Sequence, residues 1–254
     1  MLRRRAATRS GHVAMFHHGR CGSSVLGDLL DQHSALRWDG EVFNFKRSFW
    51  TERATATECA DPLAVLERRV EKSRKSIYGF ECKFYHARRI GFSLEELVPA
   101  LEKRGFTRFV VLDRRNTLRK VVSSLVAARR GSARLPAGVV APLLRVHVPV
   151  DAVPIDSTCK PLVELLREYQ DSVCRIETLL ADRPLLRLRY EDDLAQDPLA
   201  GYRTACDFLG LAVEQPEVRF SRTTPHPWRQ VVENPEAVTA ALAGTEFEWM
   251  TAED

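Results

Sequence analysis

The sequence lacks several features that would point away from a globular enzyme. It has no apolar run approaching the roughly 18 residues that a membrane-spanning helix needs, and no long apolar segment follows its basic first residues. Its six cysteines form no CxxC pair and show no spacing of metal ligands. We therefore expect a cytoplasmic chain with reduced thiols, no secretory signal, no membrane span and no zinc site.

Lysine is also scarce, since seven of the 38 basic residues are lysines and the other 31 are arginines. The planar guanidinium of arginine matches the oxygens of phosphate and sulfate in a bidentate manner. Codon usage that favours arginine explains most of this excess equally well. The net charge of +4 is small for a nucleic-acid-binding protein, whose charge would be larger and arranged in stripes. We expect no nucleic-acid partner.

What is present is enough apolar material for a large core, with 254 residues of which 44% are hydrophobic. Short apolar segments alternate with amphipathic ones. The pattern predicts strands at 12–16, 77–84, 108–112 and 185–190, and helices at 23–33, 116–130 and 161–180. This alternation indicates an α/β fold, in which helices flank a central parallel β-sheet and ligands bind at the carboxyl ends of the strands. We expect one domain over residues 1–254.

Two segments do not fit the alternation. Residues 46–75 are charged and predicted to be helical, and residues 131–161 contain five prolines without a clear period. Insertions of this kind over an α/β scaffold often form substrate walls or lids. Ordinary surface packing is the other interpretation.

The first predicted strand leads into His17-His18-Gly19-Arg20-Cys21-Gly22-Ser23-Ser24, after which apolar residues begin a helix. Glycines 19 and 22 let the backbone approach a ligand closely, and a helix start offers backbone amides and a positive dipole to an anion. A Walker A loop would place a lysine before its serine or threonine, and this loop has none, which makes a metal-dependent NTPase a poor fit. A plain strand-to-helix connection would have a similar sequence.

A second motif narrows these alternatives. The strand 109–112 is followed by Asp113-Arg114-Arg115-Asn116, and Ser123 and Ser124 lie in the next helix. Together the two motifs resemble the nucleotide-binding motifs of sulfotransferases that use 3′-phosphoadenosine-5′-phosphosulfate (PAPS). The resemblance implies that Arg20-Cys21-Gly22-Ser23-Ser24 binds the 5′-phosphosulfate. It also implies that Arg115 and Ser123, eight residues apart, bind the 3′-phosphate, with Arg114 as a helper.

The C-terminal half extends the resemblance. Leu188-Arg189-Tyr190-Glu191-Asp192, Asp197-Pro198 and Phe208-Leu209-Gly210 follow in the order found in the family. In the family the tyrosine, here Tyr190, can approach the adenine. Arg222 lies in the region where the family closes a loop over the nucleotide, although this match is loose. Residues 244–249 resemble the end of some bacterial carbohydrate sulfotransferases.

The resemblance implies a P-loop-like three-layer α/β enzyme that transfers a sulfo group from PAPS to a hydroxyl of a carbohydrate or small-molecule acceptor, releasing adenosine 3′,5′-bisphosphate (PAP). Arg20 would stabilise the charge that develops on the bridging oxygen, and no metal cofactor is expected. Two alternatives stay open, a nucleotide-dependent kinase of P-loop architecture and a non-catalytic anion- or glycan-binding module. The sequence leaves the acceptor and the oligomeric state open.

An alcohol acceptor must lose its proton, so a base is needed near it. The candidates are His17, His18, His86 and Glu41, and we favour Glu41 because several bacterial members of the family place a glutamate base after the second short strand. A surface glutamate is the plain alternative. We expect partial desolvation to raise the pKa of Glu41 toward the working pH, with nearby arginines opposing the rise. Lys83 would either touch the acceptor or lie at a solvated strand edge.

Overall fold

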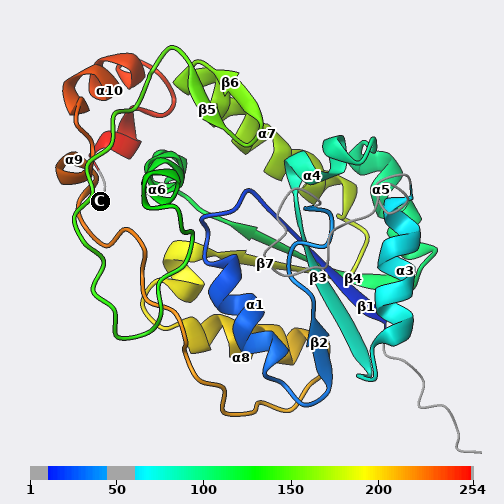
Figure 1. Cartoon of the computed structure of the whole chain (residues 1–254). Helices are drawn as coiled ribbons and strands as arrows, with labels where there is room; N and C mark the ends of the chain where they lie inside the picture. Colours follow the sequence, from blue (N-terminus) through cyan, green and yellow to red (C-terminus); the bar gives the residue numbers. More distant parts are fainter. Residues whose placement is uncertain (1–10, 45–60, 253–254) are drawn as a thin grey trace, which may run out of the picture.

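The computed structural model describes residues 11–44 and 61–252. Its centre is a parallel sheet of five strands in the order β2-β3-β1-β4-β7 (Figure 1). The strands are β1 (His12–His17), β2 (Leu36–Trp38), β3 (Ile77–Lys83), β4 (Phe106–Asp113) and β7 (Leu185–Arg189). The chain leaves β1 first toward β2 and β3 on one side and later returns to β4 and β7 on the other. A crevice beside β1 is therefore expected at the carboxyl edge, where such sheets bind ligands.

Helices cover both faces of the sheet because successive residues of each strand point to opposite sides. Val13 and Met15 pack with α1 (Ser23–Asp31) and α8 (Pro198–Leu209). Ala14 and Phe16 pack on the other face, with α3 (Pro62–Lys72), α4 (Phe84–Arg89), α5 (Leu94–Glu102) and the end of α7 (Leu162–Leu179). The predicted three-layer α/β class is confirmed. Within residues 11–44 and 61–252, no helix is both long and apolar enough to cross a membrane.

A further apolar cluster lies beyond the carboxyl edge of the sheet (Figure 1). It joins α6 (Thr117–Arg130) and the first half of α7 to the C-terminal elements α9 (Trp228–Val231), α10 (Pro235–Leu242) and the 3-10 helix η2 (Glu248–Thr251). Asn116 caps α6 by accepting the N–H of Arg119, and Gly131 ends the helix in the left-handed conformation. These caps fix where α6 starts, and hence where Ser123 lies.

The two segments that break the alternation adopt different structures. Residues 46–60 of the first lie outside the described residues, and its later part forms α3, whose Leu63, Leu66 and Val70 pack on the sheet. The second, 131–161, runs extended and pairs with later segments at Pro136–Phe220 and Val146–Val232. It ends in a two-stranded hairpin, β5 (Val153–Ile155) and β6 (Thr158–Lys160).

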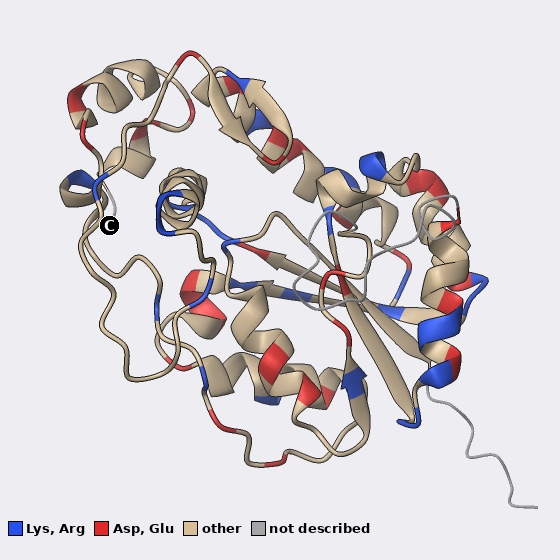
Figure 2. Cartoon of the chain, in the orientation of Figure 1, with Lys and Arg blue, Asp and Glu red and all other residues tan. Residues whose placement is uncertain are grey.

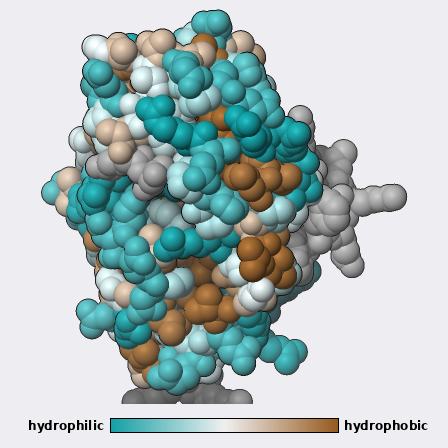
Figure 3. All heavy atoms as spheres, turned by 90° about the vertical axis from the view of Figure 1, so that its left-hand side faces the viewer, coloured by the Kyte–Doolittle hydropathy of each residue, from teal (hydrophilic) through white to brown (hydrophobic). Residues whose placement is uncertain are grey.

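The extended part of this second segment carries apolar side chains on its surface. Val139, Val140 and Leu143 are 43%, 87% and 48% exposed. Figure 3 views this side of the molecule and shows hydrophobic residues gathered in several patches on it. The segment therefore combines buried anchors with an exposed apolar stretch.

Candidate functional site

The candidate site lies where β1, β3 and β4 end side by side. Register pairs His17 with both Lys83 and Leu112, so the residues that follow these positions start from one edge. Basic residues from several separate segments lie around this edge (Figure 2). The sequence motifs around Arg20 and Arg114, far apart in the chain, therefore meet here.

The loop between β1 and α1 has an unusual backbone. Gly19, Arg20 and Gly22 all have positive φ angles, of 81°, 58° and 87°. Gly22 is the N-cap of α1 and offers no side chain to the first amides of the helix. Successive amides in such a turn form a concave surface that suits an anion. The predicted phosphate loop thus has the backbone form that its glycines suggest.

Position 22 also has no space for a side chain. A Cβ atom there would lie 2.9 Å from Leu194 and 3.1 Å from Tyr190, both in the π-helical turn η1 (Tyr190–Leu194). Gly131 has a similar φ of 74°, yet a Cβ atom there would meet nothing within 4 Å. A comparison of alanine substitutions at the two glycines therefore distinguishes the cost of backbone strain from the cost of a packing clash.

We expect Gly22→Ala to destabilise the protein by about 1–3 kcal/mol more than Gly131→Ala, because both variants strain the backbone but only the first adds a clash. Urea unfolding of the two variants and the parent chain measures the difference. Equal losses of unfolding free energy would contradict the packing role assigned to Gly22.

The side chain of Arg20 bridges three segments at the mouth of the loop. Its guanidinium donates to the Ser123 hydroxyl at 3.1 Å, to the carbonyl of Ala133 at 2.8 Å and to the Thr223 hydroxyl at 2.5 Å. Sequence reasoning placed Arg20 and Ser123 at opposite ends of the nucleotide, whereas here the two side chains are bonded to each other. Arg20 is therefore directed at the middle of α6 and at two segments beside it.

Arg114 supports the loop from below. Its guanidinium donates to the carbonyl of Arg20 at 3.0 Å and lies 4.7 Å from the centroid of the Tyr190 ring. Burial lowers the pKa of Arg114, and the positive charge of the exposed Arg222 acts in the same direction. Tyr190 in turn packs against Gly22. The structure thus brings Arg114 and Tyr190 to the same loop.

Arg115 lies farther out. It donates to both carboxylate oxygens of Asp192, at 2.7 and 2.9 Å, and its side chain is 45% exposed. Its backbone N–H donates to Glu191. Arg115, which we predicted to bind the 3′-phosphate, is therefore paired with Asp192 in this structure. Among the described residues, no contact joins Arg115 to Ser123.

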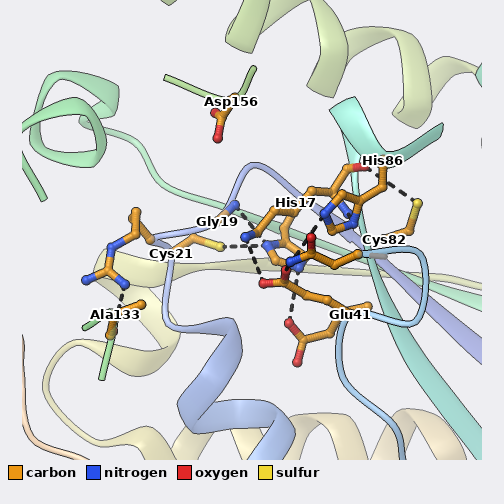
Figure 4. Close-up of polar contacts among 12 residues, drawn as sticks. His17, Gly19, Cys21, Glu41, Cys82, His86, Ala133 and Asp156 are labelled. Carbon is orange, nitrogen blue, oxygen red and sulfur yellow. Dashed lines mark hydrogen bonds and ion pairs between the residues drawn. The ribbon is translucent and has the colours of Figure 1, made fainter. Parts of the chain in front are cut away.

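His17 is fully buried beneath the loop. Its Nδ1 accepts the N–H of Gly19 at 2.9 Å and lies 3.7 Å from the sulfur of Cys21, while its Nε2 lies 3.2 Å from Glu81 (Figure 4). Burial alone would lower the pKa of His17, but Cys21 and Glu81 act in the opposite direction and raise it. Glu81 also accepts from the indole of Trp38. These contacts place His17 as a support of the loop.

Beyond the end of β2, Glu41 forms an ion pair with Lys83 at 2.7 Å and accepts from the side-chain amide of Asn44. The buried His86 places its Nε2 3.7 Å from the same carboxylate (Figure 4). Burial alone would raise the pKa of Glu41, but the charge and hydrogen bond of Lys83 outweigh burial and lower the pKa to about 2. The expectation that the pKa of Glu41 is raised is wrong, because Lys83 on the neighbouring strand stabilises the ionised carboxylate.

The contacts around Glu41 also determine the charge states of His86 and Lys83. Burial and the positive charge of Lys83 lower the pKa of His86 to about 3, so His86 is neutral. Burial alone would lower the pKa of Lys83, but Glu41 outweighs it and raises the pKa. Lys83 is therefore charged, and Glu41 faces one cation and one neutral imidazole.

Sequence reasoning missed one group of polar residues beside the loop. Lys120, Asp156 and Tyr169 bond to one another, and Tyr169 also contacts His18. The only signal in the sequence is that Lys120 precedes Ser123 by three residues and so shares its face of the helix. Asp156 could not be placed, because it arrives on the β5–β6 hairpin of the proline-rich segment.

Comparison with known proteins finds a similar fold among solved structures. No family model and no curated protein matches the sequence. Among solved structures, the chain is similar to the crystal structure of a sulfotransferase from Alicyclobacillus acidocaldarius, with a TM-score of 0.50 and 16% sequence identity. The match covers 95% of this chain and 96% of that one. The fold of this chain therefore resembles that of a sulfotransferase over almost its whole length.

Proposed function

We propose that this chain is a sulfotransferase that moves the sulfo group of PAPS to a hydroxyl of a carbohydrate or small-molecule acceptor. The observation that carries the proposal is the loop of residues 19–22, in which Gly19, Arg20 and Gly22 have positive φ angles. Arg20 joins this loop to Ser123, and the loop lies beside the Glu41–Lys83 pair. Hydrogen-bond donors that could bind an anion and a carboxylate that could accept a proton from an alcohol thus lie close together at the carboxyl edge of the sheet. The similarity in fold supports the same reading.

The residues present suit the nucleotide that this reaction needs. The loop amides and Arg20 would hold the 5′-phosphosulfate, Arg115 and Ser123 the 3′-phosphate, and Tyr190 the region of the adenine. Arg222 would close over the nucleotide. Gly22 lets the loop pack closely against Tyr190 and Leu194, which places the Tyr190 ring beside the loop that would hold the nucleotide.

Transfer of the sulfo group forms a bond from the acceptor oxygen to sulfur and breaks the bond from sulfur to the bridging oxygen. The transition state is expected to be loose, so positioning and charge stabilisation carry the catalysis. Arg20 would stabilise the negative charge that develops on the bridging oxygen. Glu41 would accept the hydroxyl proton, and its basicity would increase as Lys83 turns from Glu41 toward the anionic group.

Binding measurements distinguish this function from a P-loop kinase. With magnesium chelated, the purified chain should bind adenosine 3′,5′-bisphosphate more tightly than ATP. The reverse order would favour the kinase. Transfer of labelled sulfate from PAPS to any acceptor in a screen would exclude a non-catalytic binding module.

We expect Arg115→Ala to weaken binding of the bisphosphate roughly 10- to 100-fold, because charge-assisted hydrogen bonds to the 3′-phosphate are lost. Binding of adenosine 5′-monophosphate should change much less. Asp192→Asn should have the opposite effect, since it removes the group that now holds Arg115. Isothermal titration calorimetry with both nucleotides measures these effects.

The matched control is Arg187→Ala, which removes an exposed arginine of β7 that is paired with Glu177 of α7. Its bisphosphate affinity should equal that of the parent chain. Equal losses for both nucleotides in Arg115→Ala would show that Arg115 does not read the 3′-phosphate. Ser123→Ala is a poorer test, because it also removes a partner of Arg20.

A further inference from the structure

Lys120 is a lysine with only 1% of its surface exposed. Its ammonium group donates to the carboxylate of Asp156 and to the hydroxyl of Tyr169, and it lies 3.6 Å from the centroid of the Tyr169 ring. Burying an ammonium group is costly unless an anion and hydrogen-bond acceptors compensate it. Asp156 is the carboxylate that compensates Lys120 in this structure.

The position of Lys120 links it to the anion loop. It lies on α6 one turn before Ser123, the residue that accepts from Arg20. Tyr169 connects it to the loop from the other side, since the Tyr169 ring lies 4.5 Å from the ring of His18 and the Tyr169 carbonyl is 2.9 Å from His18 Nε2. Burial lowers the pKa of His18, and the charge of Lys120 lowers it further.

Asp156 reaches Lys120 from the tip of the β5–β6 hairpin. Both residues of the turn, Asp156 and Ser157, have positive φ angles, of 57° and 65°, and neither is glycine. Turns of this shape favour Asn or Asp at the first position and glycine at the second, so Asp156 suits its position and Ser157 is the less usual residue. In Figure 4 the Asp156 carboxylate points toward the turn at Gly19.

We propose that Lys120 binds the sulfo group that is transferred, and that Asp156 is a stand-in counter-ion that this anion displaces. The proposal rests on the proposed function. A buried ammonium group needs one anionic partner, so an anion arriving in the loop competes with Asp156 for Lys120. Its displacement would free the hairpin tip and the Asp156 carboxylate.

The charge state of Lys120 supports the replacement of Asp156 by another anion, because the loss of Asp156 alone would leave the ammonium group without an anionic partner. Burial lowers the pKa of Lys120 to about 8, although Asp156 opposes this shift. Without either Asp156 or an incoming anion, the lysine would lose its proton more readily. An anion beside Lys120, which is Asp156 in this structure, therefore favours the protonated form of the lysine.

The test measures the affinity for inorganic sulfate by calorimetry at pH 6.5, with and without saturating adenosine 3′,5′-bisphosphate. Lys120→Met should weaken sulfate binding at least tenfold while the bisphosphate affinity stays within threefold. Asp156→Asn should strengthen sulfate binding several-fold, because the competing carboxylate is gone. Lys103→Met, at the exposed end of α5, serves as the control with parental affinities.

Unchanged or weaker sulfate binding in Asp156→Asn would overturn the proposal, as would equal losses of sulfate and bisphosphate binding in Lys120→Met. If Lys120→Met does not fold, the Asp156→Asn result decides alone. Failure of the parent chain to bind the bisphosphate would count against the proposed function. Unaltered sulfate binding in both variants would count against the role of Lys120.

Discussion

Glu41→Gln should lower kcat about 100-fold or more while the affinity for adenosine 3′,5′-bisphosphate stays within about twofold, because the amide keeps the shape of the side chain and cannot accept the acceptor proton. The measurement is sulfate transfer under saturating PAPS with the best acceptor from the screen. Glu246→Gln, which alters an exposed glutamate paired with Arg167, is the matched control and should retain parental kcat.

The pH dependence provides a second readout of Glu41. Its pKa of about 2 means that the carboxylate is already ionised at any pH above about 4. Ionisation of Glu41 in the free enzyme should therefore produce no rise of kcat/KM between pH 5 and pH 8. An acid limb centred in this range would assign the base to another group.

The histidines define the outcome that would contradict this assignment. Normal turnover by Glu41→Gln together with an inactive His18→Asn or His86→Asn would transfer the role to a histidine. His86 is buried beside Glu41 and neutral, so a loss confined to His86→Asn with a parental Glu41→Gln would identify it directly. His17→Asn tests the support of the loop instead and should affect anion binding.

The central fold was predictable from the sequence because buried parallel strands are short apolar runs and the helices between them keep one apolar face. The predicted strands at 12–16 and 108–112 correspond to β1 and β4, and the predicted helix at 116–130 corresponds to α6. The cap at Asn116 and the glycine at 131 are local signals that the sequence carries by itself. Elements that depend on such signals need no knowledge of distant contacts.

The electrostatics of the site were less predictable, because they depend on residues that only the sheet order brings together. Glu41 lies after β2 and Lys83 at the end of β3, and the parallel pairing of these two strands sets up the ion pair that lowers the pKa of Glu41. The sequence showed each residue but not their pairing. Asp156 illustrates the same limit, since a hairpin in a proline-rich segment carries it to Lys120 on a different element.

Arg20→Ala should lower kcat by roughly 100- to 1000-fold, as expected for the loss of a preorganised donor to developing charge. KM for PAPS should rise far less, because the contact strengthens as charge builds on the bridging oxygen. Alanine is no more strained than arginine at the φ of 58° found here, so the backbone of the loop should persist. Steady-state kinetics with varied PAPS separates the two constants.

The complication is that Arg20 also joins the loop to Ser123, Ala133 and Thr223, so its loss could act through these segments. Thr223→Val removes one of the three contacts without touching the guanidinium and should cost less than about tenfold in kcat. Arg20→Lys keeps the charge but cannot bridge three acceptors in one plane, so it should recover only part of the rate. If Arg20→Ala keeps kcat within twofold of the parent, or if Thr223→Val loses as much as Arg20→Ala, the arginine holds the site together and does not stabilise the transferring group.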